Sequence, residues 1–233
     1  MNKKKIIIFG TGEYADLATY YFHNDEKCEY EIAAYVSDPE YITNKTHNNL
    51  PVISSEVVEQ IYPPSNYDAH VALSYRKLNQ IREEKYHLMK EKGYKLVSYV
   101  CSRSVTWPDL DVGDNCFILE NQTIQPTVKI GNNVMIWSGN HLGHNCIIGD
   151  HTYISSHVCI SGHVEIGERC FLGVNSAFAD FTKVGSDCFI GMGADVVNNL
   201  EDGSMALCSK SNIFDKDNSL TKRVMNSYFR LEK

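Results

Sequence analysis

The stretch from Gly131 to Asp180 decides the fold, and it reads GNNVMIWSGNHLGHNCIIGDHTYISSHVCISGHVEIGERCFLGVNSAFAD. Apolar residues recur in it at every sixth position. The same spacing extends over fifteen consecutive positions, all occupied by Ile, Leu, Val or Phe: Val112, Ile118, Ile124, Ile130, Ile136, Leu142, Ile148, Ile154, Ile160, Ile166, Leu172, Phe178, Val184, Ile190 and Val196. Chance would give such a run with a probability on the order of 10⁻⁹, so the period reflects the fold. A period of six is typical of a parallel β-helix with hexapeptide repeats.

Glycines divide these repeats into groups of three. A glycine follows the apolar residue in every third hexapeptide, at Gly113, Gly131, Gly149, Gly167 and Gly185. One coil therefore has three short faces, and the coils stack as a triangular prism. The fourth residue after each apolar residue is small and is expected inside the prism, and four of these residues are cysteines: Cys116, Cys146, Cys170 and Cys188. We interpret them as small core thiols rather than redox groups.

The first part of the chain alternates strand and helix signals instead. Strands are predicted over residues 5–10, 30–38, 69–75 and 94–100, and helices over 13–22, 54–61 and 78–93. Such alternation predicts a parallel sheet with helices on its faces. The predicted organisation is a Rossmann-like α/β domain at residues 1–98, a β-helix at 99–198 with an atypical first coil near Val100, and a C-terminal tail at 199–233. The tail is expected to hold one more strand and a short helix near Leu220–Phe229.

The composition narrows the class of protein. The chain has 233 residues, 43% of them hydrophobic, and a formal net charge of −7. Apart from Lys3–Lys5 it has no dense basic run, which argues against nucleic acid as a partner. No apolar run is long enough for a membrane span or a signal peptide. We therefore expect a cytoplasmic protein with reduced cysteines and, without a CxxC pair, no zinc site built from cysteine.

Two segments carry a family resemblance: IIIFGTGEYADLA, which begins at Ile6, and the stretch Gly131–Asp180. Through them the chain resembles the sugar acetyltransferases of the sialic-acid O-acetyltransferase, bacillosamine N-acetyltransferase and perosamine N-acetyltransferase group, over roughly residues 5–197. The resemblance implies a left-handed prism, a homotrimer, and a nucleotide-linked sugar bound to the N-terminal domain. It also implies that acetyl-CoA, the co-substrate, lies along the prism between neighbouring subunits. The implied reaction acetylates the amino group of a nucleotide-linked 4-amino-4,6-dideoxy sugar for surface polysaccharide biosynthesis.

His144 is the predicted general base. The family motif of a histidine, an acidic residue and C-x-I-G matches HNCIIG here, with Asn145 in the acidic position. The spacing supports the same residue independently, because His144 lies two positions after Leu142, at or beside a corner, and Gly162 follows one coil later. His144 could then accept a proton from the attacking group, and Gly162 could donate its backbone N–H to the thioester oxygen. The amide of Asn145 is expected to orient the ring and to stabilise its charged form less than a carboxylate would.

Further contacts are predicted on both substrates. For CoA, the candidates are Gly162, Asp180, Lys183 and Met192, with Lys210 as another phosphate contact. For the nucleotide sugar, the GTGE turn between a strand and a helix offers backbone N–H groups to a phosphate, which points to Gly10, Thr11, Gly12 and Glu13. The resemblance assigns Asp38 to the nucleotide base. Ser74 follows a strand at the same sheet edge, and His141, nearer the middle of a face, is assigned to substrate contact or packing.

Three alternatives stay open. The first is a sialic-acid-type sugar O-acetyltransferase, and the second is a non-catalytic trimeric β-helix that binds a sugar. The third is a zinc hydro-lyase, because His151, His157 and His163 recur every six residues. A step of six moves each histidine to the next corner of the prism, so the three cannot converge within one chain, and only a site across a subunit interface stays open. We therefore expect no metal.

Overall fold

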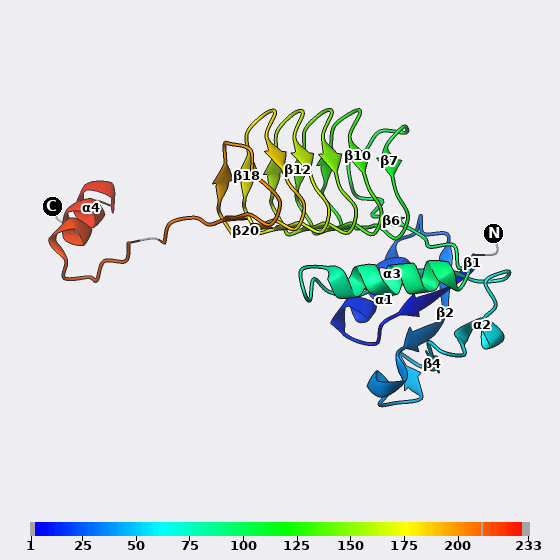
Figure 1. The fold of residues 1–233 in the computed structure, drawn as a ribbon. Helices are drawn as coiled ribbons and strands as arrows, with labels where there is room; N and C mark the ends of the chain where they lie inside the picture. Colours follow the sequence, from blue (N-terminus) through cyan, green and yellow to red (C-terminus); the bar gives the residue numbers. More distant parts are fainter. Residues whose placement is uncertain (1–2, 211, 230–233) are drawn as a thin grey trace.

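The computed structural model describes residues 3–210 and 212–229. A small α/β unit lies beneath one face of a prism of stacked coils, and the C-terminal tail leaves the far end of the prism (Figure 1). The elements of the α/β unit are β1 (Lys4–Phe9), α1 (Glu13–Asn24), β2 (Tyr30–Ser37), η1 (Pro39–Tyr41), β3 (Thr46–His47), β4 (Leu50–Ser54), α2 (Val58–Ile61), β5 (Asp68–Val71) and α3 (Gln80–Glu91). Its sheet has the order β3-β4-β2-β1-β5. Strand β1, which lies between β2 and β5, is buried over Ile6–Phe9, as expected for a parallel strand covered on both faces.

The α/β unit differs from the sequence prediction in three places. The pair β3–β4 was not predicted, and it is antiparallel, so the sheet is mixed. The helix expected over residues 54–61 is confined to α2. The strand expected over residues 94–100 does not extend the sheet: Leu96 makes one bridge to Ala69, while Tyr99–Val100 forms β6 and pairs with the prism. An apolar run predicts a strand but not its partner, and here the backbone N–H of Tyr99 donates to Cys116 in the first coil.

The prism is a left-handed parallel β-helix whose strands are two residues long. These strands are β6 (Tyr99–Val100), β7 (Asp111–Val112), β8 (Phe117–Ile118), β9 (Thr123–Ile124), β10 (Lys129–Ile130), β11 (Met135–Ile136), β12 (His141–Leu142), β13 (Ile147–Ile148), β14 (Tyr153–Ile154), β15 (Cys159–Ile160), β16 (Glu165–Ile166), β17 (Phe171–Leu172), β18 (Ala177–Phe178), β19 (Lys183–Val184), β20 (Phe189–Ile190), β21 (Asp195–Val196) and β22 (Met205–Ala206). The first face holds β7, β10, β13, β16 and β19; the second holds β6, β8, β11, β14, β17, β20 and β22; the third holds β9, β12, β15, β18 and β21. The predicted fold class is confirmed.

The six-residue period places its apolar residues inside the prism, where fourteen of the fifteen belong to one buried cluster and Val112 packs against it. The four predicted core cysteines are all fully buried, which confirms their structural interpretation. Their thiols donate to backbone carbonyls, as Cys146 does to Ser161 at 2.9 Å. Burial raises the pKa of Cys116 and of Cys170 to about 12. A thiol with such a raised pKa is a poor nucleophile near neutral pH.

Each corner of the prism carries a column of residues with left-handed backbone. The column between the first and second faces contains Asn115, Asn133, His151, Arg169 and Asp187. The column between the third and first faces contains Thr127, Asn145, His163 and Phe181. Asparagine tolerates this conformation better than other non-glycine residues, and its presence here follows from the tight turns. Because the coils are in register, side chains of one column lie directly above one another.

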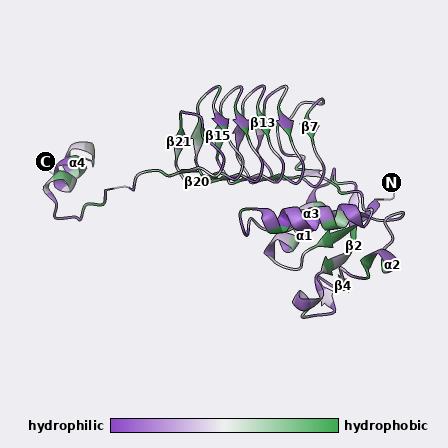
Figure 2. Cartoon of the chain, in the orientation of Figure 1, coloured by the Kyte–Doolittle hydropathy of each residue, from purple (hydrophilic) through white to green (hydrophobic). Residues whose placement is uncertain are grey.

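Helix α3 joins the α/β unit to the prism through polar contacts. Most of α3 is hydrophilic (Figure 2), yet Arg82 on it is only 3% exposed. The Arg82 guanidinium donates to the carbonyl of His151 at 2.6 Å and to that of Asn133 at 3.3 Å. Burial lowers the pKa of Arg82 to about 10, still far above neutrality, so it is charged. A buried cation bound to backbone carbonyls therefore contributes to this interface, beside an apolar cluster that includes Phe22 of α1 and Phe117 of β8.

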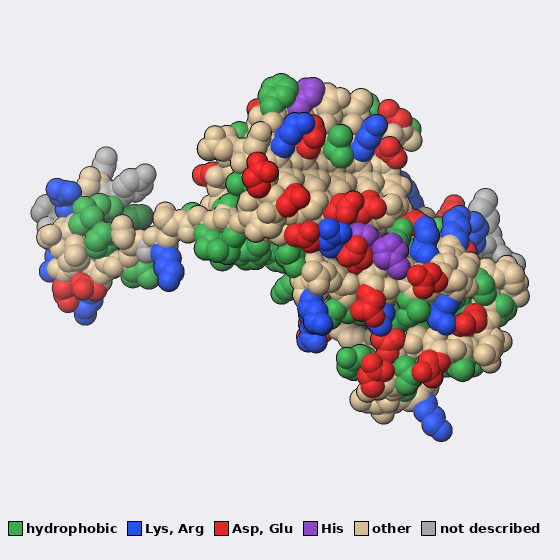
Figure 3. Space-filling model, in the orientation of Figure 1, with side chains coloured by type: hydrophobic (Ala, Val, Ile, Leu, Met, Phe, Trp, Pro, Cys, Tyr) green, Lys and Arg blue, Asp and Glu red, His purple; other side chains and the backbone are tan. Residues whose placement is uncertain are grey.

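The tail contains the expected strand and helix, namely β22, which extends the second face, and α4 (Ser219–Phe229). Hydrophobic side chains lie on the prism surface beneath the start of the tail (Figure 3). Phe189 of β20 and Met205 of β22, at this end of the second face, are both exposed. Among residues 3–210 and 212–229, no helix has the length and apolar character needed to cross a membrane.

Acid should destabilise the α/β unit through His70. This side chain is 1% exposed, donates from Nδ1 to the carbonyl of Val97, and burial lowers its pKa to about 4. As the pH falls below 6.5, the unfolded chain binds a proton that the folded chain does not, so folding stability is lost down to about pH 4. The loss should approach about 3 kcal/mol. Urea unfolding at several pH values measures it, and His70→Gln should flatten the profile. Parallel profiles for the two proteins would contradict the prediction.

Candidate active site

His144 lies on the turn between β12 and β13, at the corner of the third and first faces. Its side chain is exposed, and its ring covers Gly162 in the next coil. A Cβ atom built on Gly162 would lie 2.9 Å from Nε2 of His144. Only a glycine leaves room for the ring in this position. The spacing of one full coil thus correctly predicted that these two residues are stacked.

The amide of Asn145 lies beside the other ring nitrogen of His144. Nδ2 of Asn145 is 3.0 Å from Nδ1 of His144 and 3.4 Å from Nε2 of His163. On its other side, Oδ1 of Asn145 is 2.7 Å from Oγ1 of Thr127. The rings of His163 and His144 meet edge to face, with centroids 4.9 Å apart, and His163 stacks on Phe181. The ring of His144 is therefore positioned by the column of left-handed residues. Thr127 and Phe181 were not predicted from the sequence, and His163 was considered only as a possible zinc ligand.

The backbone N–H of Gly162, the predicted oxyanion donor, already has an acceptor. It donates to Oδ1 of Asp180, 3.0 Å away. Asp180 was predicted to contact CoA, but in this structure its carboxylate accepts this hydrogen bond from the turn of the preceding coil. A thioester oxygen can use the Gly162 N–H only if Asp180 turns away, so both roles stay predictions that require this movement.

The remaining CoA candidates are spread over the prism. Lys183 lies on β19 of the first face, beside the His144 corner, and pairs with Glu165 at 2.8 Å. Met192 is 74% exposed but follows β20, at the corner of the second and third faces. Lys210 is exposed in the tail. Within one chain, Gly162 lies under His144 and Asp180 binds Gly162, whereas Lys183 lies further along the first face and Met192 lies at a different corner.

The predicted sugar-nucleotide residues share one edge of the sheet. Gly10–Glu13 follow β1, Asp38 follows β2 and Ser74 follows β5, and these strands are neighbours with parallel direction. The carboxyl ends of parallel strands form the usual ligand-binding edge of an open α/β sheet. Gly10 has φ +128°, and a Cβ there would lie 2.7 Å from the carbonyl oxygen of Ala72, so the turn requires glycine. Gly12 caps α1 and is exposed.

Asp38 is not free at this edge. Its Oδ2 pairs with Nζ of Lys85 at 2.8 Å, and its Oδ1 accepts a hydrogen bond from Ser55 at 2.8 Å. A ligand that contacts Asp38 has to share the carboxylate with these two partners. His141 is half-buried on β12 of the third face, beside Cys159 of β15. It therefore lies away from the sheet edge, where the other predicted sugar contacts are.

An aromatic cluster at this edge was missed by the sequence analysis. The hydroxyls of Tyr14 and Tyr153 are 2.9 Å apart, and Trp137 donates to Tyr153. Tyr75 packs against Tyr153 and Phe171, with both centroid separations 5.0 Å. The sequence does carry one signal of this cluster. In every third hexapeptide, the residue just before the inward apolar residue is large, and in the structure it points out of the second face. These residues are Phe117, Met135, Tyr153, Phe171 and Phe189.

The two halves of the predicted site lie on different sides of the prism. The α/β unit covers the second face and the corner between the first and second faces. His144 lies at the corner between the third and first faces, which is opposite the second face in a triangular prism. A ligand on the sheet edge of one chain is therefore not brought to His144 of the same chain.

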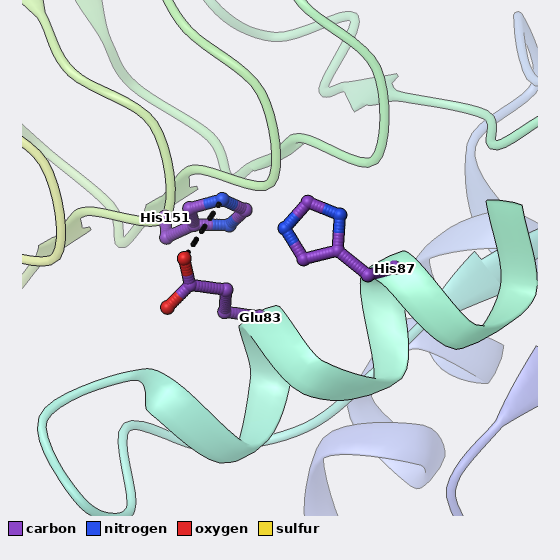
Figure 4. A group of neighbouring side chains, drawn as sticks. All are labelled: Glu83, His87 and His151. Carbon is purple, nitrogen blue, oxygen red and sulfur yellow. Dashed lines mark ion pairs between the residues drawn. The ribbon is translucent and has the colours of Figure 1, made fainter. Parts of the chain in front are cut away.

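A group of possible metal ligands lies between α3 and the prism. Glu83, His87 and His151 offer ligand atoms that all lie within 4.8 Å of one another. The side chains of Glu83 and His87, one turn apart on α3, point toward His151 (Figure 4). Arg169 competes for the carboxylate, because its Nη1 is 3.3 Å from Oε1 of Glu83.

Hydrogen bonds along the corner column assign the proton of His151. The backbone N–H of Val71 donates to Oδ1 of Asn115, so Nδ2 of Asn115 faces and donates to Oδ1 of Asn133. Nδ2 of Asn133 then donates to Nδ1 of His151 at 2.8 Å. The neutral ring must carry its proton on Nε2, which faces Glu83 at 3.6 Å. Burial lowers the pKa of His151, in keeping with a neutral ring. A metal ion would have to displace this proton, so the absence of a metal stays our prediction.

Replacing Gly162 by alanine should reduce activity with little loss of stability. The new Cβ would meet Nε2 and Cε1 of His144 at 2.9 and 3.0 Å, and because these atoms end an exposed side chain, the ring is expected to swing away. Such a displacement of a catalytic group typically costs about 10²-fold in rate. The rate of acetyl transfer and the urea midpoint check it. In Gly173→Ala, by contrast, the Cβ would lie 2.5 Å from the backbone nitrogen of Met192, so stability should fall. An unchanged rate in Gly162→Ala would contradict the arrangement.

Among known proteins, the chain matches one family model and is similar to a set of solved structures. The model of the bacterial transferase hexapeptide (six repeats) matches residues 127–162. No curated protein sequence matches the chain. The acetyltransferase domain of PglB from Neisseria gonorrhoeae FA1090 has a similar structure, with a TM-score of 0.75, 23% identity, and coverage of 87% of this chain and 96% of that domain.

Two further structures are similar over most of their length. A mutant of perosamine N-acetyltransferase from Caulobacter crescentus, in complex with CoA and GDP-perosamine, has a TM-score of 0.77 and 21% identity, and the match covers 89% of this chain and 97% of that one. WeeI from Acinetobacter baumannii AYE has a TM-score of 0.71 and 18% identity, with coverage of 87% and 96%. The chain therefore contains the bacterial transferase hexapeptide repeat and has the fold of these acetyltransferases, a small α/β unit followed by a left-handed parallel β-helix.

Proposed function

We propose that the protein transfers an acetyl group from acetyl-CoA to the amino group of a nucleotide-linked sugar. The observation that carries the proposal is the exposed ring of His144 stacked over Gly162, with Asn145 beside its second nitrogen. Such a ring can take a proton from an attacking amine. The structural similarity to a perosamine N-acetyltransferase that binds CoA and GDP-perosamine supports a nucleotide-linked 4-amino-4,6-dideoxy sugar as the acceptor. Surface polysaccharide biosynthesis is the corresponding pathway.

The reaction forms a C–N bond and an S–H bond, and it breaks a C–S bond and an N–H bond. The amine nitrogen attacks the thioester carbon, and the C–S bond breaks to release CoA. Nε2 of His144 accepts the proton that the amine loses and returns it to the departing thiolate. Residues 99–198 supply this chemistry in the proposal, while residues 1–98 hold the nucleotide sugar at the sheet edge.

The protein acts as a homotrimer in this proposal. The sheet edge and His144 lie on opposite sides of one prism, so a sugar bound to one chain needs the His144 corner of a neighbour. Acetyl-CoA would then lie between subunits beside Gly162 and Lys183. Analytical ultracentrifugation measures the oligomeric state, and a fully active monomer would exclude the shared site.

The direct test is release of free thiol from acetyl-CoA with a panel of acceptors. The panel holds nucleotide-linked sugars with an amino group, and the same sugars with a hydroxyl group in its place. We expect turnover with an amino sugar. Turnover with hydroxyl sugars alone would establish an O-acetyltransferase instead. Absence of thiol release with every acceptor, despite binding of a nucleotide sugar, would favour a non-catalytic binding protein.

A further inference from the structure

We propose that the hydroxyl of Thr127 selects the active tautomer of His144 by holding the amide of Asn145. This inference rests on the proposed function, because it assigns Thr127 and Asn145 as positioning residues for the same base. Thr127 and Asn145 occupy successive places in one corner column, with φ of 66° and 59°. Their side chains lie above one another because the coils are in register.

The single hydroxyl proton of Thr127 has two candidate acceptors. Oγ1 of Thr127 lies within hydrogen-bond distance of the carbonyl oxygen of Pro126 and is 2.7 Å from Oδ1 of Asn145. The same Oγ1 accepts a hydrogen bond from the backbone N–H of Asn145 at 3.1 Å. One proton cannot be donated to both oxygens, so one of these two contacts places two acceptors against each other.

Flipping the amide of Asn145, so that its oxygen and nitrogen exchange places, removes the conflict. Nδ2 of Asn145 then donates to Oγ1 of Thr127, and the hydroxyl proton goes to Pro126. Oδ1 takes the place 3.0 Å from Nδ1 of His144 and 3.4 Å from Nε2 of His163. The amide oxygen then faces two donors when His144 carries its proton on Nδ1 and His163 carries one on Nε2. The two amide orientations have nearly the same shape, so the hydrogen-bond network decides between them.

The amide orientation decides which nitrogen of His144 can act as a base. With Nδ2 toward the ring, Nδ1 accepts a hydrogen bond and the neutral ring carries its proton on Nε2, which cannot accept another. With Oδ1 toward the ring, Nδ1 carries the proton and Nε2 has a free lone pair. Nε2 is the atom that lies over Gly162. The orientation favoured by Thr127 is thus the one that a general base requires.

The tautomer can be measured without any substrate. Two-bond ¹H–¹⁵N correlation spectra of the ¹⁵N-labelled protein distinguish the two neutral forms of an imidazole. The chain has nine histidines, and the signal of His144 is assigned by its loss in His144→Gln. At about pH 8, where imidazoles are mostly neutral, we expect His144 of the native protein in the Nδ1–H form. Observation of the Nε2–H form would overturn the proposal.

Variants at Thr127 separate positioning from simple packing. Thr127→Val keeps the branched shape and removes the hydroxyl, so His144 should shift toward the Nε2–H form and kcat should fall about 10–100-fold, the usual range for a partner of a functional side chain. Thr127→Ser keeps the hydroxyl and should restore both readouts. KM for acetyl-CoA should not change. An unchanged tautomer in Thr127→Val would overturn the proposal. If that variant does not fold, the tautomer of His144 in the native protein tests the proposal on its own.

The variant Asn145→Asp tests the role of Thr127 independently. An aspartate accepts the proton of Nδ1 without help from Thr127 and stabilises the charged ring, so the pH at half-maximal rate should rise by about one unit. The double variant with Thr127→Val should behave like Asn145→Asp alone, and a further loss of about 10-fold in the double variant would contradict the role of Thr127. Failure of the proposed function can be told apart from failure of this inference, because the tautomer is measured without substrate. A protein that transfers no acetyl group can still show the Nδ1–H form of His144.

Discussion

Replacing His144 by alanine should lower kcat for acetyl transfer by about 10²–10⁴-fold, the usual contribution of a general base. The variant loses the ring that covers Gly162, so the attacking amine has to lose its proton to water. Binding of acetyl-CoA should persist, because His144 is exposed and the walls of the corner are formed by the coils themselves. Thiol release measures the rate, and calorimetric titration with CoA measures binding.

His157→Asn is the matched control for this prediction. His157 is also an exposed histidine at a prism turn, but it lies at the corner between the second and third faces. Asparagine tolerates its left-handed backbone, φ 59°. The control should keep the native rate. Native activity in His144→Ala would remove His144 from the mechanism, and an equal loss in both variants would point to a general effect on the prism.

Replacing Arg82 by methionine should destabilise the protein by at least about 3 kcal/mol. Methionine fills a similar volume but leaves the carbonyls of His151, Asn133 and Ser74 without their buried donor. Each buried acceptor left unpaired costs about 1–3 kcal/mol. The loss should appear first in the α/β unit, because Arg82 links α3 to the prism.

Urea unfolding followed by circular dichroism and by tryptophan fluorescence tests this prediction. Trp137 lies on the second face beside Tyr14 of α1, so its emission reports separation of the two units. We expect an early fluorescence transition in Arg82→Met, ahead of the loss of β-helix signal. Arg76→Met is the control, because Arg76 is exposed and such surface changes usually stay within about 0.5 kcal/mol. Equal midpoints for the two variants would show that the buried guanidinium does not hold the units together.

Most of the prism could be predicted because its register repeats. A shift of one full coil along the chain returns each position to the same place on the next coil, so the contact between His144 and Gly162 follows from counting. The same counting places Thr127 and Asn145 in successive coils at one corner of the prism. Counting does not predict the direction of a side chain. Asp180 could equally have faced solvent, yet its carboxylate accepts a hydrogen bond from the backbone N–H of Gly162.

The α/β unit was less predictable because its contacts have no period. Residues 94–100 have the composition of a strand, but their partner is a coil of the prism. Asp38 was correctly placed at the end of β2, whereas its ion pair with Lys85 depends on the position of α3. Tyr75 and Tyr153 are far apart in the sequence and meet only when the unit covers the second face.

The sequence by itself determined the β-helix, its inward residues and the stack of His144 on Gly162, because a parallel sheet in register converts spacing directly into contact. Only the tertiary structure decided which face the α/β unit covers and, with it, that the sugar edge and His144 lie on opposite sides of one prism. The large residues that point out of the second face are one side of this interface, but their apolar partners on the α/β unit follow no period. The polar contacts are equally hidden, because Arg82 donates to backbone carbonyls. Every residue carries a carbonyl, so the sequence does not mark the ones that such a guanidinium binds.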